Sequence, residues 1–341
     1  MTLSSPKQNW VVASEDRVKT LELSRALGIP RIAAHLLVAR GLETVEDAQR
    51  FLNPSIEHLT DPFLLRGMRV AVDRIQLARQ RGERVLIFGD YDVDGMAGTA
   101  ILLSGLRRFG IKEVEVGLPS RLIEGYGLAP EHVQAAWASG VSLIITVDNG
   151  INARDAANTA RDLCIDLIVT DHHQIEGELP HAVAIVNPKL ESPDYPGADI
   201  SGAAVAFKLV HALTGSIDDL DLVALGTVAD VVPLRKENRT LVALGLTQMA
   251  TEPRMGVRQL ASVAGINIAE ITAEQIAFQL GPRLNAAARL GDAQLPLDLL
   301  MTESYSDAVK MAGQLNRCNE ERKTIENDIL ERAMAQIISA D

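Results

Sequence analysis

The 341-residue sequence has few cysteines, few aromatic residues and no long hydrophobic run, and each shortage excludes a class of protein. Its two cysteines, Cys164 and Cys318, lie far apart without a CxxC pair, which excludes a disulfide framework and a cysteine-rich zinc site. No apolar run approaches the roughly 18 residues that a membrane span needs. The N-terminus carries charges where a signal peptide has an apolar stretch, so we expect a cytoplasmic protein that does not contact a membrane.

The composition leaves the function open. Aromatic residues make up 4% of the chain and hydrophobic residues 47%, so a sizeable core must be built from Leu, Ile, Val and Ala. The net charge of −12 argues mildly against a general nucleic-acid binder. That argument is weak, because a metal site made of aspartates adds negative charge that bound cations offset.

The pattern of short aliphatic runs predicts the fold class. Five such runs alternate with helical segments and predict strands at 84–89, 114–118, 142–147, 166–170 and 182–186. Strands that are apolar on both faces and joined by helices form a doubly wound, mostly parallel five-stranded α/β sheet. We therefore expect an N-terminal helical region over 1–80, the sheet domain over 81–300, and one long charged helix over 301–341. Within the first region, Thr44 is suited to cap a helix.

Polar residues directly follow four of the five predicted strands. In an open parallel sheet, ligands bind in the crevice outside the carboxyl ends of the strands. We therefore expect these side chains to converge at one edge of the sheet. They are Asp90, Asp92 and Asp94 after the first strand, Asp148 and Asn149 after the third, Asp171, His172 and His173 after the fourth, and Asn187 after the fifth.

The residue types in this group favour a metal site. Carboxylates this close together repel each other and raise each other's pKa unless cations lie between them. Carboxylate with some imidazole suits Mg²⁺ or Mn²⁺, and two such ions about 3.5–4 Å apart are usual for phosphoester hydrolysis. Each feature alone has a plainer interpretation, since Asp92 and Asp148 are suited to cap helices and His172 to pack in a core. Their joint occurrence at strand ends favours metal binding.

Other catalytic motifs are missing from the sequence. It contains no GxxxxGK[ST], and no GxGxxG follows the first predicted strand, so a P-loop ATPase or a Rossmann dehydrogenase has little support. It also contains no GxSxG, which a serine hydrolase of the α/β type would need.

Motifs along nearly the whole chain resemble the DHH superfamily of phosphodiesterases, named after the triplet Asp171-His172-His173. Four stretches resemble its motifs: FGDYDVDGMAGTAIL (88–102), ITVDNGI (145–151), VTDHH (169–173) and LGTVADVVPL (225–234). Others resemble RecJ-type exonucleases in particular: FLNPSIEHLTDPFLLRGM (51–68), EGYGL (124–128), SGAAVAFKL (201–209) and GPRLNAAARLGDA (281–293).

The resemblance implies an exonuclease that hydrolyses single-stranded DNA from a 5′ end in DNA repair and recombination, using two Mn²⁺ or Mg²⁺ ions. By motif position, the metal ligands are Asp92, Asp94, Asp148, His172 and Asp230, with Asp148 bridging the ions and Asp90 in or next to the ligand set. His173 is placed at the scissile phosphate, or alternatively orients its neighbour. The same resemblance suggests a monomer whose partners include a single-strand-binding protein or a helicase.

Several further residues are candidates for substrate binding. Arginine suits bidentate phosphate contact, so we expect Arg283 and Arg289, with Asn285 between them, to bind the DNA backbone; a salt bridge on the helix surface is the alternative. Asn149 is a further candidate, and Tyr126 is suited to stack on a base or to pack. Ser201 is interpreted as a helix cap rather than a DNA contact.

Two departures from the family pattern matter. Phe88 stands where some members have a histidine, which leaves one ion with fewer ligands and disfavours a family II pyrophosphatase. The chain also stops within what resembles the helix that connects to a DHH-associated domain and an OB-fold, so we expect a truncated protein whose own activity is open.

Two other functions are weighed against the exonuclease. One is a DHH phosphodiesterase for short oligonucleotides or cyclic dinucleotides, which the RecJ-like stretches disfavour. The other is a catalytically silent fragment or scaffold that binds nucleic acid, which the presence of all five proposed ligands disfavours as ancestry.

Overall fold

The computed structural model describes residue 14 and residues 16–119, 125, 127–192 and 195–340. The chain divides into two compact units, Met1–His58 and Leu59–Asp341. The first contains helices α1 (Arg17–Leu27), α2 (Arg31–Ala39) and α3 (Val45–Leu52), followed by a 3₁₀ turn at Ile56–His58. Leu23, Ala34, Leu37 and Ala48 form its small core. Thr44 caps α3 as expected, because its side chain accepts a hydrogen bond from the backbone N–H of Asp47.

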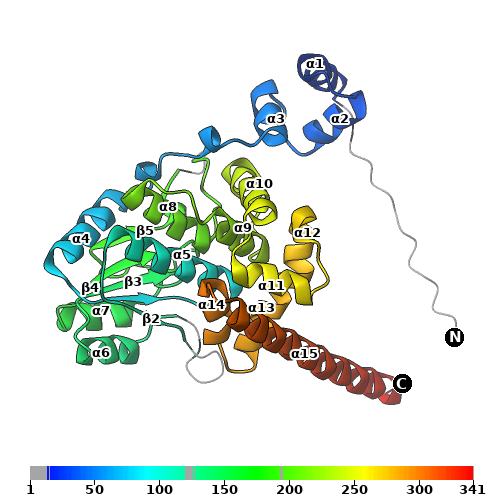
Figure 1. Cartoon of the computed structure of the whole chain (residues 1–341). Coiled ribbons are helices and arrows are strands. Elements are labelled where there is room, and N and C mark those ends of the chain that lie inside the picture. The colour runs from blue at the N-terminus through cyan, green and yellow to red at the C-terminus, as the bar shows by residue number, and fades with distance from the viewer. Residues whose placement is uncertain (1–13, 15, 120–124, 126, 193–194, 341) are drawn as a thin grey trace. The chain divides into compact units, whose positions relative to one another are not determined.

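The second unit is built on a five-stranded parallel sheet (Figure 1). Its strands are β1 (Val85–Phe88), β2 (Val114–Gly117), β3 (Leu143–Val147), β4 (Asp166–Thr170) and β5 (Ala184–Val186), in the order β2-β1-β3-β4-β5. All four neighbouring pairs are parallel, with Val85 opposite both Val114 and Leu143. Each of the five aliphatic runs forms one strand, and the predicted fold class is confirmed.

Helices cover both faces of the sheet because successive side chains of a strand point to opposite faces. Val85 and Ile87 pack in a core with α4 (Met68–Arg81), α5 (Val93–Phe109) and α8 (Gly202–Thr214). Leu86 and Phe88 pack in a separate core with α6 (Pro130–Ala138) and α7 (Arg154–Asp162). Phe88 thus fills the interior, with its ring centroid 4.7 Å from that of His132.

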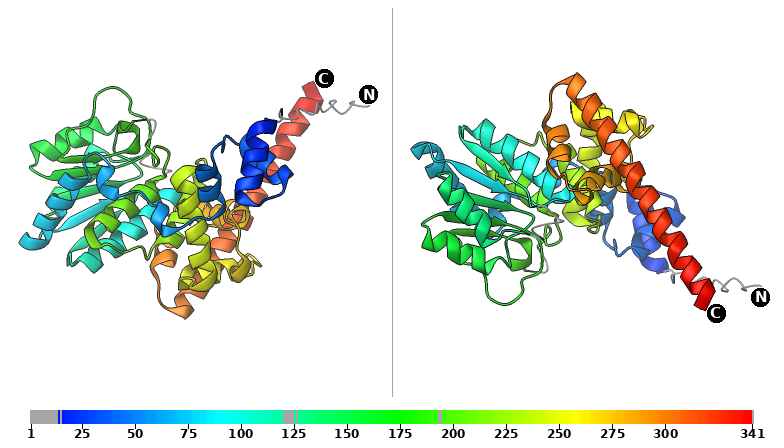
Figure 2. Two further views of the ribbon diagram at one scale, coloured as in Figure 1. Left: turned by 90° about the horizontal axis from the view of Figure 1, so that it is seen from above. Right: turned by 90° about the horizontal axis from the view of Figure 1, so that it is seen from below.

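The helices that follow the sheet complete the second unit (Figure 2). They are α9 (Leu220–Ala229), α10 (Lys236–Thr251), α11 (Met255–Val263), α12 (Ala273–Gln275), a π-helical turn (Ile276–Leu280), α13 (Gly281–Arg289), α14 (Gln294–Met301) and α15 (Tyr305–Ala340). The long terminal helix is present as α15. The helical pattern over 273–290 is interrupted by the π turn, just before Pro282, whose missing N–H cannot support regular helical bonding. The sequence did not single out the short helices α11 and α14.

Along the chain, the first compact unit ends at His58 and the second begins at Leu59, whereas the division expected from the sequence lies at residue 80. The difference concerns α4, whose Met68, Ala71 and Ile75 are fully buried in the core under the sheet. No helix among the described residues has the length and hydrophobicity that crossing a membrane requires.

Candidate metal centre

The turn between β1 and α5 brings three aspartates to the carboxyl edge of the sheet. Asp92 is the N-cap of α5, and its carboxylate accepts a hydrogen bond from Gly95 N at 3.0 Å. Asp94 lies in the first turn of the same helix and is almost fully buried. Asp90 is also buried and accepts a hydrogen bond from Tyr91 N. The capping interpretation of Asp92 is therefore correct, and it is compatible with a ligand role because a second carboxylate oxygen is present.

The ends of β3 and β4 supply the next side chains. Asp148 follows β3 with a φ of 64°, in the left-handed region that a non-glycine residue seldom adopts. Its carboxylate is buried, and Oδ1 lies 3.0 Å from Nε2 of His172, which follows β4. A strained backbone that places a buried carboxylate against an imidazole is typical of functional sites.

Asp230 closes the cluster from the C-terminal end of α9. His172 Nε2 lies 3.6 Å from Asp230 Oδ2 and 3.7 Å from Asp94 Oδ2. One imidazole nitrogen therefore faces three carboxylates that come from three separate parts of the sequence, Asp94, Asp148 and Asp230.

Two glycines let the helices α8 and α9 approach these carboxylates. A Cβ added at Gly202 would lie 2.4 Å from Asp148 Oδ1, and one added at Gly226 would lie 2.4 Å from Asp94 Oδ1. The Asp94 carboxylate accepts hydrogen bonds from Gly202 N at 2.6 Å and Ala203 N at 3.0 Å. The N-terminus of α8, with its partial positive charge, thus holds Asp94 in place. Ser201 caps this helix through a bond from Ala204 N, as the sequence predicts.

Burial and mutual repulsion keep these carboxyl groups from ionising easily. Burial and the charges of Asp230 and Asp92 raise the pKa of Asp94 to about 8. Burial, followed by the charge of Asp94, raises the pKa of Asp148 well above its ordinary value. Burial and the charge of Asp92 raise the pKa of Asp90 to about 7 and that of Asp230 to about 6. Such a cluster is expected to bind cations, because a cation restores the charged form.

The donor atoms fit Mn²⁺ or Mg²⁺ at two neighbouring positions. There are three groups of residues, and within each group the ligand atoms lie within 4.8 Å of one another. Burial, with the charge of His173, lowers the pKa of His172 to about 4, so this imidazole is neutral and able to ligate at neutral pH. Oxygen donors with one or two imidazoles suit these two metals. The groups are Asp90, Asp92 and Asp148; Asp94, His172 and Asp230; and Asp148, His172 and His173.

Asp171 is a functional residue that the sequence analysis left without a role. Its carboxylate accepts hydrogen bonds from Ile151 N at 2.9 Å, from His172 N at 2.7 Å and from His173 N at 3.0 Å, and it contacts His173 Nδ1 at 2.7 Å. Burial alone would raise the pKa of Asp171, but the hydrogen bonds and the charge of His173 outweigh it and lower that pKa. The same bond raises the pKa of His173. Asp171 therefore orients both histidines, a role that its position at the strand end could have suggested.

The proposed substrate contacts near the sheet differ in their surroundings. Asn149 is fully buried, and its amide donates to the carbonyls of Phe88 at 3.2 Å and Val147 at 2.9 Å, so it links β1 to β3. These bonds give Asn149 a structural role. Tyr126 lies outside the described residues.

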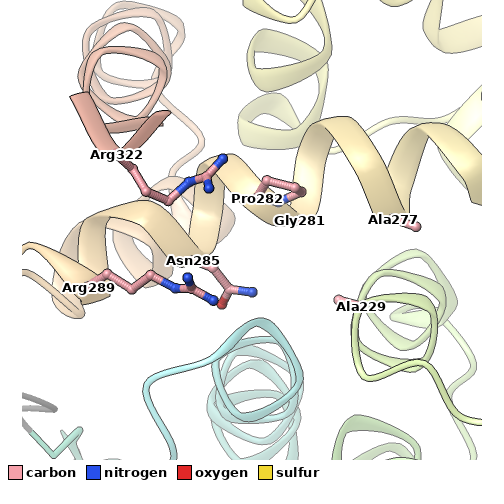
Figure 3. A pocket seen from close by; sticks show the side chains of 7 residues that line it. All are labelled: Ala229, Ala277, Gly281, Pro282, Asn285, Arg289 and Arg322. Atoms are coloured by element: carbon pink, nitrogen blue, oxygen red, sulfur yellow. The ribbon is translucent and has the colours of Figure 1, made fainter. Parts of the chain in front are cut away.

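The proposed contacts on α13 lie beside the metal cluster. Asn285 and Arg289 line a cavity of about 190 Å³, together with Ala229, the neighbour of Asp230 in sequence, and Arg322 of α15 (Figure 3). Arg283 lies outside this lining. Its guanidinium donates to Asn316 Oδ1 at 3.0 Å and to the carbonyl of Gln279 at 2.7 Å, so it fastens α13 to α15 instead of forming the surface salt bridge considered above.

Comparison with known proteins assigns this arrangement to a family. The chain matches the model of the DHH family, N-terminal domain, over residues 84–245. It is 39% identical over 333 residues to the single-stranded-DNA-specific exonuclease RecJ of Bacillus subtilis, which covers 97% of this chain and 42% of that protein. A crystal structure of exonuclease RecJ bound to manganese superposes with a TM-score of 0.76 and 36% identity, covering 83% of this chain and 72% of the other. The chain belongs to the DHH family.

Other relatives give the same assignment. RecJ of Thermus thermophilus in complex with Mn²⁺ has a TM-score of 0.82 and 34% identity, and the match covers 94% of this chain and 46% of that one. RecJ of Escherichia coli is 37% identical over 316 residues, covering 87% of this chain and 54% of that protein. The DHH chain described here thus spans about half the length of the curated relatives it matches.

Proposed function

We propose that this DHH chain hydrolyses phosphodiester bonds of single-stranded DNA from a 5′ end, with two Mn²⁺ or Mg²⁺ ions. The observation that carries the proposal is the convergence of Asp94, Asp148 and Asp230 within 3.7 Å of one imidazole nitrogen. The similarity to proteins named single-stranded-DNA-specific exonucleases supports the substrate.

The three ligand groups support a division of roles. We propose that Asp90, Asp92 and Asp148 hold one ion, and that Asp94, His172 and Asp230 hold the other. Asp148 also belongs to the group with His172, which supports a bridging role. Phe88 is buried in the β1 strand and contributes no donor, so the first ion depends on carboxylates alone. When bound, such ions neutralise a phosphate and activate a water nucleophile.

We propose that His173 contacts the scissile phosphate. Asp171 holds its Nδ1 at 2.7 Å, so Nε2 is the ring atom assigned to the substrate. The bond to Asp171 raises the pKa of His173, which favours the positively charged imidazolium that a phosphate attracts. Asn187 Nδ2 donates to the His173 carbonyl at 3.1 Å and fixes the backbone at the same point.

The wider biological setting is also a proposal. We infer that the chain acts as a cytoplasmic monomer in repair and recombination, on strands that a helicase or a single-strand-binding protein presents. The two unpaired cysteines agree with a reducing compartment. Sedimentation of the purified chain with and without such a partner tests the monomer and the partner.

The test of the central proposal is degradation of single-stranded DNA that carries a 5′ label. The wild type should release short labelled products only with Mn²⁺ or Mg²⁺, and Asp148→Asn should release none. The matched control is Asp162→Asn, which changes a carboxylate that is 68% exposed on α7 and should leave cleavage unchanged.

Three results would contradict the proposal. Cleavage that survives Asp148→Asn would reject the site, and cleavage of short RNA alone would favour the oligonucleotide phosphodiesterase. If the wild type cleaves nothing, calorimetric titration with Mn²⁺ decides whether the chain lacks metal binding or only cleavage. Binding that disappears only in Asp148→Asn would keep the metal centre and reject nuclease activity for this chain by itself.

A further inference from the structure

The cavity beside the metal cluster has a positive lining in an acidic protein. Arg289 and Asn285 reach into it from α13, and Arg322 reaches into it from α15 (Figure 3). None of the described residues that line it is a carboxylate, although the whole chain has a net charge of −12. The remaining lining residues are small or apolar, so the cavity's polar character comes from the two guanidinium groups and one amide.

The cavity lies next to the proposed site of hydrolysis. Its wall includes Ala229, which directly precedes the proposed ligand Asp230. On the opposite side, a Cβ added at Gly281 would lie 3.7 Å from the Ala229 Cβ, so α13 packs closely on the end of α9. A group bound in the cavity is therefore a short distance along a strand from the reacting phosphate.

Arg322 is held in place on α15 and still has unused hydrogen-bonding capacity. Its Nη1 donates to Glu326 at 2.7 Å and its Nη2 to Asn319 at 3.2 Å, and Asn319 is buried. Its Nε is buried and has no hydrogen-bond partner among the described residues. Arg289, on the facing helix, forms no ion pair or hydrogen bond with any described residue. A buried donor without a partner is costly, and an acceptor supplied by a ligand would remove that cost.

The position of Arg322 is fixed by the contact between α13 and α15. Arg283 of α13 donates to Asn316 of α15 at 3.0 Å, less than two helical turns before Arg322. Ala308, Ala312 and Leu315 of α15 are fully buried in the main core. The two arginines therefore line the cavity from two helices that are packed together, and Arg322 is already partly ordered by its contacts with Glu326 and Asn319.

We propose that Arg322, with Arg289 and Asn285, binds a backbone phosphate of the DNA strand beside the metal centre. The proposal rests on the proposed function and adds Arg322, a residue of the long helix, to the substrate-binding surface. Two guanidinium groups and an amide offer several N–H donors in fixed planes, which is the recognition chemistry of a phosphodiester. Arg283 then positions α15 against α13 and does not contact the DNA directly.

The experiment measures binding of a fluorescent oligothymidylate in EDTA, where cleavage cannot occur, over a range of KCl concentrations. Each phosphate contact contributes about 0.7 to the slope of log K against log salt for single strands. Arg322→Gln should therefore flatten the slope by about 0.7. The matched control is Arg332→Gln on the same helix, because Arg332 also pairs with a carboxylate one turn away, Asp328 at 2.7 Å, and is 76% exposed. Its slope should equal that of the wild type.

A second variant keeps the proposal testable if Arg322→Gln unfolds. Glu326→Gln removes the carboxylate that competes for Arg322 Nη1, so it should tighten binding more than Asp328→Asn, which removes a similarly exposed charge from the same helix. Strands with a 5′-phosphate and a 5′-hydroxyl should behave alike, since the assigned ligand is an internal phosphate.

The outcomes separate this proposal from the proposed function. A wild-type slope for Arg322→Gln, or flattening confined to 5′-phosphorylated strands, would overturn the assignment while Mn²⁺-dependent cleavage stays intact. A flattened slope in a protein that never cleaves DNA would keep the phosphate site and reject the nuclease. If the wild type does not bind the oligothymidylate in EDTA, the phosphate site is overturned, and the Mn²⁺-dependent cleavage assay decides the nuclease separately.

Discussion

Helix α9 has aspartates at both of its ends, buried at its start and partly buried at its end, and their neighbouring charges differ. At its start, Arg254 Nε lies 2.5 Å from Asp221, and Arg254 Nη2 lies 3.3 Å from Asp219. Arg108, a residue of α5, also pairs with Asp219. At its end, Asp230 faces Asp94 and His172, and no described lysine or arginine pairs with Asp94 or Asp230.

The contrast separates structural charge from functional charge. At the first end each carboxylate has a guanidinium partner, which allows it to be buried in the charged form. At the second end burial and repulsion raise the pKa of Asp94 to about 8 and that of Asp230 to about 6. One end of the helix is therefore neutralised by arginines, whereas the carboxylates at the other end lack such partners and are suited to bind cations.

The largest effect should come from removing one carboxylate at the metal-binding end. Asp230→Asn deletes a proposed ligand charge with almost no change in volume, and we expect DNA cleavage to fall by about 1,000-fold, or roughly 4 kcal/mol of transition-state stabilisation. Asp221→Asn, at the other end of α9, should leave the rate per folded molecule unchanged. Single-turnover cleavage with Mn²⁺ measures both. Equal losses in the two variants would mean that the ends do not differ in function.

The opposite pattern is expected for stability. Asp221→Asn leaves Arg254 without its closest partner, and breaking a buried pair of this kind costs about 3 kcal/mol of unfolding free energy. Asp230→Asn removes a repelling charge and should leave the metal-free protein as stable as the wild type, or more stable. Urea denaturation in EDTA compares them. A larger loss of stability in Asp230→Asn would show that the metal-binding end is also a structural ion-pair site.

The pH dependence of the metal-free protein should show the same cluster. The pKa of Asp94 and of Asp230 is higher in the folded state than the ordinary value of 3.8, so unfolding releases protons. The stabilisation is complete below pH about 4 and is lost as the pH rises through about 6 and then about 8. Mn²⁺ should reverse the loss, adding about 2.7 kcal/mol at 100 times its Kd. Urea midpoints from about pH 5 to about pH 8.5, with and without Mn²⁺, test this; a midpoint that rises with pH in EDTA contradicts it.

Sequence patterns were sufficient for the sheet and for the polar residues at its strand ends, because both depend on local signals. Each aliphatic run became one strand, and Asp92, Asp148 and His172 lie at strand ends where a parallel sheet gathers its ligands. Asp230 is different: it follows a helix, and only the resemblance to the DHH family placed it with the others.

The features that the sequence did not indicate depend on long-range packing. Asn149 is a predicted substrate contact, and only the folded structure shows that its amide nitrogen donates to carbonyls of β1 and β3. Arg322 lies in a charged helix with many similar residues, and only the packing of α15 on α13 distinguishes it from Arg332. The roles of Gly202 and Gly226 likewise appear only when α8 and α9 are seen against the carboxylates.

The smallest expected effects come from two glycines that pack opposite ends of α9. A Cβ at Gly226 would lie 2.4 Å from Asp94 Oδ1, and a Cβ at Gly245 of α10 would lie 2.2 Å from the Leu220 carbonyl. Both alanine variants overpack a helix contact, which costs about 1–3 kcal/mol, offset in part because alanine favours a helix by up to about 1 kcal/mol. Both stabilities should therefore fall, and that of Gly245→Ala should fall further because its Cβ meets a backbone carbonyl rather than the end of a side chain.

What should differ between these two variants is metal affinity. Gly226→Ala displaces the Asp94 carboxylate, so Mn²⁺ binding should weaken by about 10-fold, the scale seen when groups that support a metal ligand are changed. Gly245→Ala disturbs only the arginine-paired end and should bind Mn²⁺ like the wild type. Calorimetric titration of both variants at one pH measures the difference. Equal affinities would mean that Asp94 moves freely, and the close approach of α9 would then be packing alone rather than part of the metal centre.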